Sequence, residues 1–246
     1  MSDPVRINKY LSEAGVCSRR EADRRIAEGF VTINGRKAVI GDRVFPDDTI
    51  MFGKKRVSKE EAVILLAVNK PVGIVCTAQK REPDNIVDYV KYPKRVYPVG
   101  RLDKDSHGLI LMTNQGDLVN KMMRGGNLHE KEYIVRVNRE VTESFLRQMA
   151  QGVYLEELGV TTRPCHVEKV GKYTFRIILT QGLNRQIRRM CQVFQYRVID
   201  LKRVRIMNIC LGSLKEGAYR EVTEEEWGEL LEQIRSSSNQ PVFPKW

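Results

Sequence analysis

Apolar side chains near the start of the chain recur with the period of an α-helix. In residues 7–14 they fall at i, i+3, i+4 and i+7, which is one face of a helix. A second helix is predicted in SRREADRRIAEG, where Ser18 and Glu21 have capping-box spacing and the closing glycine stands at a C-cap position. In the following VTINGRKAVI, Asn34 and Gly35 separate two short β-branched runs, which predicts a tight hairpin turn.

The pattern changes after a polar stretch, GKKRVSKEEA, which has no apolar periodicity and is predicted to be a linker. Beyond it, apolar runs typical of strands alternate with helix-spaced runs. The predicted strands are VILLAV, RVYPV, GLILMT, EYIVRV, TFRIILT and LKRVRIMNICL. The predicted helices are DLVNKMM, TESFLRQMAQG, NRQIRRMCQVF and a last one that begins near Thr223. This succession predicts an α+β fold with a mixed sheet.

The length of the chain predicts two domains. Its 246 residues exceed the ~100–200 residues of an ordinary domain. We expect a small domain over residues 1–52, a linker over 53–62, a larger domain over 63–236 and a frayed tail over 237–246.

The charge of the chain favours a polyanionic partner. A formal net charge of +11 fits nucleic acid or an anionic membrane surface. No apolar run approaches the ~20 residues that span a bilayer, and the first residues lack the apolar core of a signal peptide, so we expect a cytoplasmic protein with no membrane partner.

The basic residues gather in two regions. Residues 172–220 contain eleven Lys or Arg and two acidic residues, a formal 11 − 2 = +9. The other region is the predicted second helix and hairpin, whose cations can spread over successive phosphates. We expect RNA contacts from Arg19, Arg20, Arg24, Arg25, Arg36 and Lys37.

The cysteines and histidines give no sign of a metal site. The five cysteines are scattered without a C-x-x-C pair, and three histidines are too few to complement them. Disulfides are not expected in a chain without an export signal, so the thiols are interpreted as small packing residues.

The stretch GRLDKDSHGLILMT places two aspartates directly before an apolar strand, where a rigid scaffold can present a reactive side chain. In GLNRQIRRMCQVF, Arg188 lies beside the apolar stripe of a predicted helix, while Arg185 and Arg189 lie on other faces. An arginine at a buried edge needs a carboxylate partner. The aspartates of the first stretch are the candidates.

These motifs resemble a known family. The segment RINKYLSEAGVCSRREADRRIAEGFVTINGRKAVIGDRV resembles the S4 RNA-binding fold, and NKPVGIV, GRLDKDSHGLILMTN, HEKEYIV and GLNRQIRRM are similar, in order, to the motifs of RNA pseudouridine synthases. The resemblance covers nearly the whole chain and is strongest to the branch that modifies single sites of ribosomal RNA, in particular its large-subunit members. It implies an S4-like domain followed by a catalytic domain built on a mixed, mainly antiparallel sheet.

The resemblance also implies the reaction. Uridine would be isomerised to pseudouridine in ribosomal RNA, with 23S RNA as the expected target and 16S RNA or a tRNA as alternatives. The isomerisation involves no net redox change, so no cofactor or metal is expected, and we expect a monomer. A noncatalytic RNA-binding ribosome factor is the competing class, and a metal-dependent nuclease is a third reading with little support from the acidic residues.

Site residues follow from the matched motifs. By resemblance, Asp103 is the essential carboxylate, Arg188 the adjoining cation, and Tyr133 the residue that covers the flipped uracil and assists proton removal from C5. Leu201 is expected to form the other wall of the pocket, and Arg101 to occupy the place vacated by the base.

The remaining assignments are supporting ones. Asn69 and Lys70 are expected to shape the substrate pocket, Arg185 to bind substrate and Arg189 to bind RNA. Whether Asp103 attacks C1′, adds to the base or removes a ribose proton stays open at this stage. Asp105 receives no role.

Overall fold

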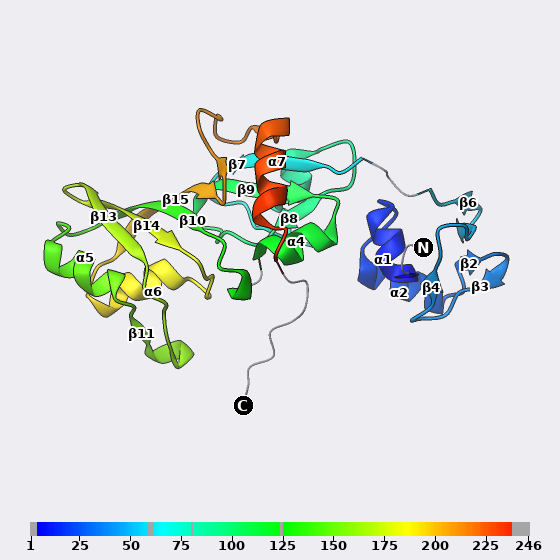
Figure 1. The fold of residues 1–246 in the computed structure, drawn as a ribbon, viewed down its shortest axis with the longest axis horizontal. Coiled ribbons are helices and arrows are strands. Elements are labelled where there is room, and N and C mark those ends of the chain that lie inside the picture. The colour runs from blue at the N-terminus through cyan, green and yellow to red at the C-terminus, as the bar shows by residue number, and fades with distance from the viewer. Residues whose placement is uncertain (1–3, 59–61, 80, 124, 238–246) are drawn as a thin grey trace. The chain divides into compact units, whose positions relative to one another are not determined.

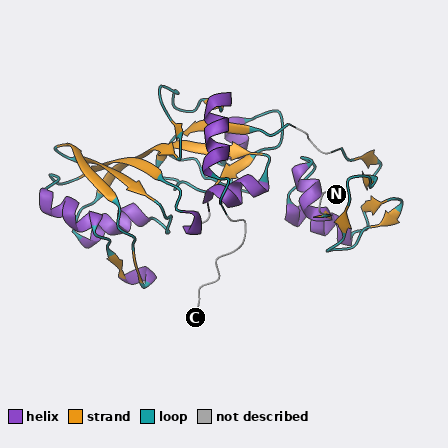
Figure 2. Cartoon of the chain, viewed as in Figure 1, coloured by secondary structure: helices purple, strands orange, loops and turns teal. Residues whose placement is uncertain are grey.

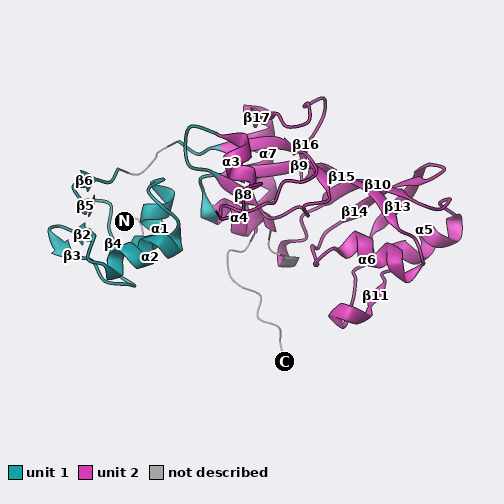
Figure 3. Cartoon of the chain, turned by 180° about the vertical axis from the view of Figure 1, so that it is seen from behind, with its two compact units in different colours: residues 1–64, 92–96, 114–116 teal, residues 65–91, 97–113, 117–246 magenta. Residues whose placement is uncertain are grey.

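The structure is a computed structural model that describes residues 4–58, 62–79, 81–123 and 125–237. The chain divides into two compact units (Figure 3). The first comprises residues 1–64, 92–96 and 114–116, and the second comprises residues 65–91, 97–113 and 117–246. The predicted tail lies outside the described residues except for its first position, Ser237.

The N-terminal unit contains the two helices that the sequence predicts, α1 (Ile7–Glu13) and α2 (Arg19–Ala27). The Ser18 hydroxyl caps α2 by accepting a hydrogen bond from the Glu21 amide at 3.2 Å. A four-stranded sheet has the order β3-β2-β5-β6, and β1 pairs with β4. The strands are β1 (Val5–Arg6), β2 (Val31–Ile33), β3 (Arg36–Lys37), β4 (Arg43–Val44), β5 (Ile50–Phe52) and β6 (Lys55–Arg56).

The hairpin turn between β2 and β3 forms as predicted. Asn34 and Gly35 have φ values of 50° and 83°, the left-handed conformations that such a turn requires. The predicted linker needs a correction, because β6 falls inside residues 53–62 and pairs with β5. Val57 is also buried in the core of this unit. The strand before it was not recognised because both of its side chains, Lys55 and Arg56, are exposed cations.

The second unit is built on one nine-stranded sheet (Figures 1 and 2). Its strands follow the order β13-β14-β10-β15-β9-β7-β17, with β16 on β15 and β8 on β9. β9 and β15 run parallel and the other neighbours antiparallel, so the predicted mixed, mainly antiparallel sheet is confirmed. The strands are β7 (Leu65–Lys70), β8 (Tyr97–Val99), β9 (His107–Thr113), β10 (Lys131–Val137), β13 (His166–Gly171), β14 (Thr174–Leu179), β15 (Val198–Ile206), β16 (Ile209–Cys210) and β17 (Tyr219–Glu221).

Helices cover this sheet in two groups. In Figure 1, α5 and α6 lie beside β10, β13 and β14, whereas α4 and α7 lie beside β7 and β9. α4 and α7 contribute Leu118, Met122 and Leu230 to a core with the strand residues Leu65 and Leu109. The helices are α3 (Ile86–Val90), α4 (Gly116–Met123), α5 (Glu143–Ala150), α6 (Gln186–Val193) and α7 (Glu224–Gln233), and short elements are β11 (Tyr154–Leu155), β12 (Val160–Thr161) and the 3-10 turns at Gly125–Asn127 and Glu156–Leu158. None of the described helices is long and apolar enough to cross a membrane.

One predicted strand is two. The run LKRVRIMNICL was expected as a single strand, but it turns back on itself at Met207, whose φ is 53°, and β16 pairs with the end of β15. The two turn residues, Met207 and Asn208, include no glycine, so the sequence contains no clear turn signal between the two strands.

Candidate functional site

The loop before β9 carries the two aspartates and is held against β15. Because β9 and β15 are parallel, with Lys202 opposite His107 and Arg203 opposite Gly108, the loop that leads into β9 lies beside the middle of β15. Gly108 has a φ of 99°, and a side chain there would collide with the Arg203 backbone. Glycine is therefore needed for the close approach that fixes the loop.

Two arginines of the α6 region meet the aspartates. Arg185 donates to both carboxylate oxygens of Asp105, through Nη1 at 3.1 Å and Nη2 at 2.9 Å. Its Nη1 is also 3.9 Å from Oδ2 of Asp103. Arg188 lies with Nε 3.5 Å from Asp105 Oδ2 and donates through Nη2 to the Asp105 carbonyl at 2.9 Å and the Ser106 hydroxyl at 3.2 Å.

This arrangement agrees with one sequence prediction and changes another. Arg188, at the edge of the apolar stripe of α6, does find a carboxylate of the loop, as its position predicts. That carboxylate belongs to Asp105, whereas the cation paired with Asp103 is Arg185. The sequence could not distinguish them, because Arg185 precedes the helix in a left-handed conformation (φ 50°) that helical spacing does not describe.

The arginines keep Asp105 ionised. Its hydrogen bonds with Arg185 and the charges of Arg188 and Arg185 hold the pKa of the Asp105 carboxyl below its usual value, against the opposing effect of partial burial. At neutral pH the loop therefore presents an anion that fixes two guanidinium groups.

Tyr133 and Leu201 lie on one face of the sheet. In the pairing of β10 with β15, Tyr133 is opposite Arg203 and Val135 is opposite Leu201, and residues directly opposite or two apart share a face. Tyr133 is 8% exposed and Leu201 5% exposed. The Arg203 guanidinium lies 6.0 Å from the centre of the Tyr133 ring.

Three strand residues of this sheet are buried cations: Lys70, Lys131 and Arg203. Arg203 is almost fully buried, and its Nε donates to the Leu109 carbonyl at 2.7 Å. Burial, followed by the charge of Arg203, lowers the pKa of Lys131 to about 8. Burial also lowers the pKa of Lys70, whose ammonium donates to the carbonyls of Pro71 and Ile74 at 2.9 and 2.7 Å. Lys70 therefore fixes the loop after β7.

Asn69, Arg101 and Arg189, the first two predicted to bind substrate and the third to bind RNA, have different environments. The side-chain amide of Asn69 donates through Nδ2 to the Leu214 carbonyl at 2.8 Å, so it holds the loop that contains Leu214. Arg101 is exposed in the loop before Asp103, and within the described residues it has no hydrogen bond or ion pair. Arg189 forms an ion pair with Glu157.

The predicted RNA-binding cations of the N-terminal unit fall into two classes. Arg24 and Arg25 pair with Glu21 of the same helix, and Arg36 pairs with Asp42 at 2.9 Å. Arg19, Arg20 and Lys37 are exposed, and none of them has an ion pair to any described residue.

Sequence reasoning missed the contacts of His107. Its Nε2 is 2.9 Å from Oδ1 of Asp200, and its Nδ1 is 3.8 Å from Glu216. The imidazole therefore links the start of β9 to β15 just before Leu201. Asp200 and Glu216 are distant in the sequence, so no local pattern connects them with His107.

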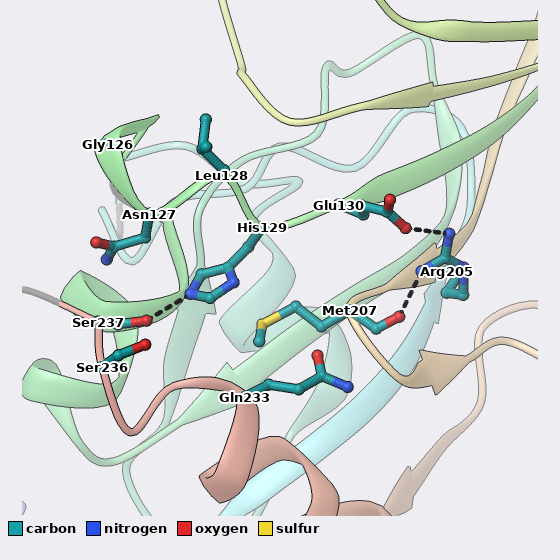
Figure 4. A pocket seen from close by; sticks show the side chains of 10 residues that line it. All are labelled: Gly126, Asn127, Leu128, His129, Glu130, Arg205, Met207, Gln233, Ser236 and Ser237. Atoms are coloured by element: carbon teal, nitrogen blue, oxygen red, sulfur yellow. Dashed lines mark hydrogen bonds and ion pairs between the residues drawn. The ribbon is translucent and has the colours of Figure 1, made fainter.

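A polar cavity of about 530 Å³ lies where β10 begins and β15 ends (Figure 4). His129 Nε2 is 2.7 Å from the Ser237 hydroxyl there, and Arg205 donates to Glu130 at 2.9 Å. Asp103, Tyr133 and Arg188 are absent from its lining, so the candidate catalytic residues do not form this cavity. Within the described ranges, no group of three or more His, Cys, Asp or Glu residues could hold a metal ion.

Comparisons with known proteins find matches to both units of the chain. Residues 64–193 match the family model described as RNA pseudouridylate synthase, and residues 5–50 match the S4 domain. A crystal structure of a pseudouridylate synthase superposes with a TM-score of 0.68 at 28% identity, covering 92% of this chain and 99% of that one.

Relatives match over nearly the whole chain. The dual-specificity RNA pseudouridine synthase RluF of Escherichia coli K12 is 53% identical over 98% of this chain and 83% of its own. Ribosomal large subunit pseudouridine synthase B of Bacillus subtilis is 37% identical over 90% of this chain and 93% of its own. The chain therefore belongs to the RNA pseudouridine synthase family, in the branch that carries an N-terminal S4 domain.

Proposed function

We propose that the chain converts a single uridine of 23S ribosomal RNA to pseudouridine, with Asp103 as the essential catalytic group. Formation of pseudouridine in ribosomal RNA is the activity that its family membership supports. The large-subunit target is favoured by the Bacillus subtilis relative, whose name gives that subunit. The observation that supports the site most is that Arg185 contacts Asp103 and Asp105, the two aspartates of a loop fixed against β15.

The reaction breaks the bond between ribose C1′ and uracil N1, turns the base and joins C5 to C1′, while C5 loses a proton and N1 gains one. The atoms and electrons of the nucleotide balance without a redox partner. A carboxylate beside the ribose can stabilise or trap the positive character that develops at C1′, as in glycoside cleavage. Asp103 is proposed for this task because Arg185 supplies a neighbouring cation without occupying both of its oxygens.

The base has to leave its stack to reach Asp103. Enzymes that act on a nucleobase pay an unstacking cost and recover it through contacts in the pocket. We infer that Arg101, exposed two residues before Asp103, fills the space that the base vacates. Tyr133 and Leu201, which share one face of the sheet, are proposed to hold the extruded uracil, with the Tyr133 hydroxyl assisting removal of the C5 proton.

The N-terminal unit is proposed to bind RNA rather than to react. Arg19, Arg20 and Lys37 are exposed cations that can pair with phosphates without breaking an existing ion pair. Arg24, Arg25 and Arg36 are expected to contribute less, since each must first be released from a carboxylate.

A tRNA is a second candidate substrate. The Escherichia coli relative is named a dual-specificity enzyme, which favours more than one RNA target for a chain 53% identical to it. Position-resolved pseudouridine mapping of ribosomal and transfer RNAs, from cells with and without this protein, tests both targets. A pseudouridine that disappears from 23S RNA supports the proposal, and loss confined to 16S RNA or tRNA contradicts the 23S assignment.

A further inference from the structure

Arg185 and Arg188 both contact Asp105. Arg185 binds both of its carboxylate oxygens, and Arg188 binds its carbonyl and approaches its carboxylate. The matched family motifs gave Asp105 no role, yet it makes more polar contacts with these arginines than Asp103 does.

The pair with Asp105 fixes the position of Arg185. A two-point contact between guanidinium and carboxylate sets orientation as well as distance, because both groups are planar. The side chain of Arg185 is 43% exposed, so without this contact it can turn into solvent and regain rotamer freedom. Among the described residues, its side chain pairs with Asp105 and Asp103.

The division of contacts suits a reactive Asp103. Arg185 Nη1 is 3.9 Å from Asp103 Oδ2, close enough for electrostatic stabilisation but longer than a hydrogen bond. A bidentate arginine on Asp103 would cover the oxygens that a ribose must meet. Because Asp105 accepts both hydrogen bonds instead, Asp103 has a cation nearby and keeps its oxygens available.

We propose that Asp105 is a positioning residue for pseudouridine formation, which holds Arg185 beside the Asp103 carboxylate. The inference rests on the proposed catalytic role of Asp103. Asp105 acts through Arg185 and does not itself touch the reacting atoms. Arg188 stabilises the position of Asp105, because it donates hydrogen bonds to the Asp105 carbonyl and the Ser106 hydroxyl.

The test is single-turnover pseudouridine formation on an RNA fragment that contains the mapped uridine, with enzyme in excess. Asp105→Asn should slow the reaction about 10-fold, equivalent to about 1.4 kcal/mol of lost transition-state stabilisation, with RNA affinity and thermal unfolding unchanged. Asp105→Glu, which keeps the carboxylate, should recover part of the rate. Asp84→Asn is the matched control, since Asp84 is an exposed carboxylate that pairs with Lys104 of the same loop at 3.4 Å, and it should react at the wild-type rate.

A double-mutant cycle distinguishes positioning from a structural role. If Asp105 acts through Arg185, the variant Asp105→Asn/Arg185→Gln should be no slower than Arg185→Gln alone. Additive losses, or a rate for Asp105→Asn within twofold of wild type, overturn the inference. Asp103→Asn separates this failure from that of the proposed function: if that variant is inactive while Asp105→Asn reacts normally, only the role of Asp105 is wrong.

Discussion

Replacing Lys131 by Met should stabilise the second unit at neutral pH, although it removes a hydrogen bond. Lys131 is 5% exposed, and its ammonium donates to the His129 carbonyl at 3.1 Å. Burial and the charge of Arg203 lower its pKa from 10.5 to about 8. A charged lysine at this position therefore opposes folding, and Met fills a similar volume without the charge.

The magnitude follows from the pKa. A fall in the Lys131 pKa from 10.5 to about 8 corresponds to about 3 kcal/mol of unfavourable free energy in the folded state. This is an upper bound on the gain from Lys131→Met, because the lost hydrogen bond reduces that gain by about 1 kcal/mol. Below pH 8 Lys131 is protonated in both states, so the whole penalty is present. Between pH 8 and 10.5 the unfolded state binds the extra proton, and wild-type stability rises with pH relative to the variant.

The assay is urea unfolding followed by the fluorescence of Trp227, which packs against the core of this unit. A Trp246→Phe background leaves Trp227 as the remaining one of two tryptophans. The stability advantage of Lys131→Met should shrink by about 2 kcal/mol between pH 7.5 and 9.5. An advantage that does not change with pH, or a variant less stable than wild type at pH 7.5, would refute a lowered pKa for Lys131.

Two further predictions concern the loop and the RNA surface. Gly108→Ala should destabilise the second unit by about 3 kcal/mol in the same assay, because the new side chain adds left-handed strain and collides with the Arg203 backbone. Gly159→Ala is the control: Gly159 has a φ of 62° and open space around it, so this substitution should cost about 1 kcal/mol. Equal losses of stability in the two variants would show that the close approach of β9 and β15 does not require glycine at position 108. The plot of log affinity for RNA against log salt concentration has a negative slope, and Arg20→Ala should make it less steep by ~0.7–0.9. Arg24→Ala should reduce the steepness by less, because Arg24 is already paired with Glu21. Binding titrations over a range of salt concentrations check this, and the reverse order would contradict it.

Much of the fold could be predicted because local patterns carried it. The capped α2, the Asn34-Gly35 turn and the apolar run of β9 each depend on residues close in sequence, and the structure confirms them. Strand β6 was hidden because its side chains are exposed lysine and arginine, and β13 because most of its side chains are partly or fully exposed. Exposed strands lack the alternation that identifies a half-buried one.

The sequence predicted which residues form the site better than it predicted which of them contact one another. The matched motifs indicated both Asp103 and Arg188, but which arginine meets which aspartate depends on how the chain enters α6. Arg185 lies just before the helix in a left-handed backbone conformation, and from there its side chain contacts both carboxylates. The sequence GLNRQ does not predict that conformation. The contact of His107 with Asp200 arises from the parallel pairing of β9 and β15, which joins segments far apart in sequence.

Single-turnover pseudouridine formation by Asp103→Asn tests the central claim most directly. The substitution is nearly isosteric and removes one partly exposed charge, since the Asp103 side chain is 36% exposed, so folding and RNA affinity should be retained. Pseudouridine should not form on the RNA fragment that carries the mapped uridine, because the anion that stabilises C1′ is gone. Turnover near the wild-type rate by a folded Asp103→Asn variant would show that the chemistry resides elsewhere.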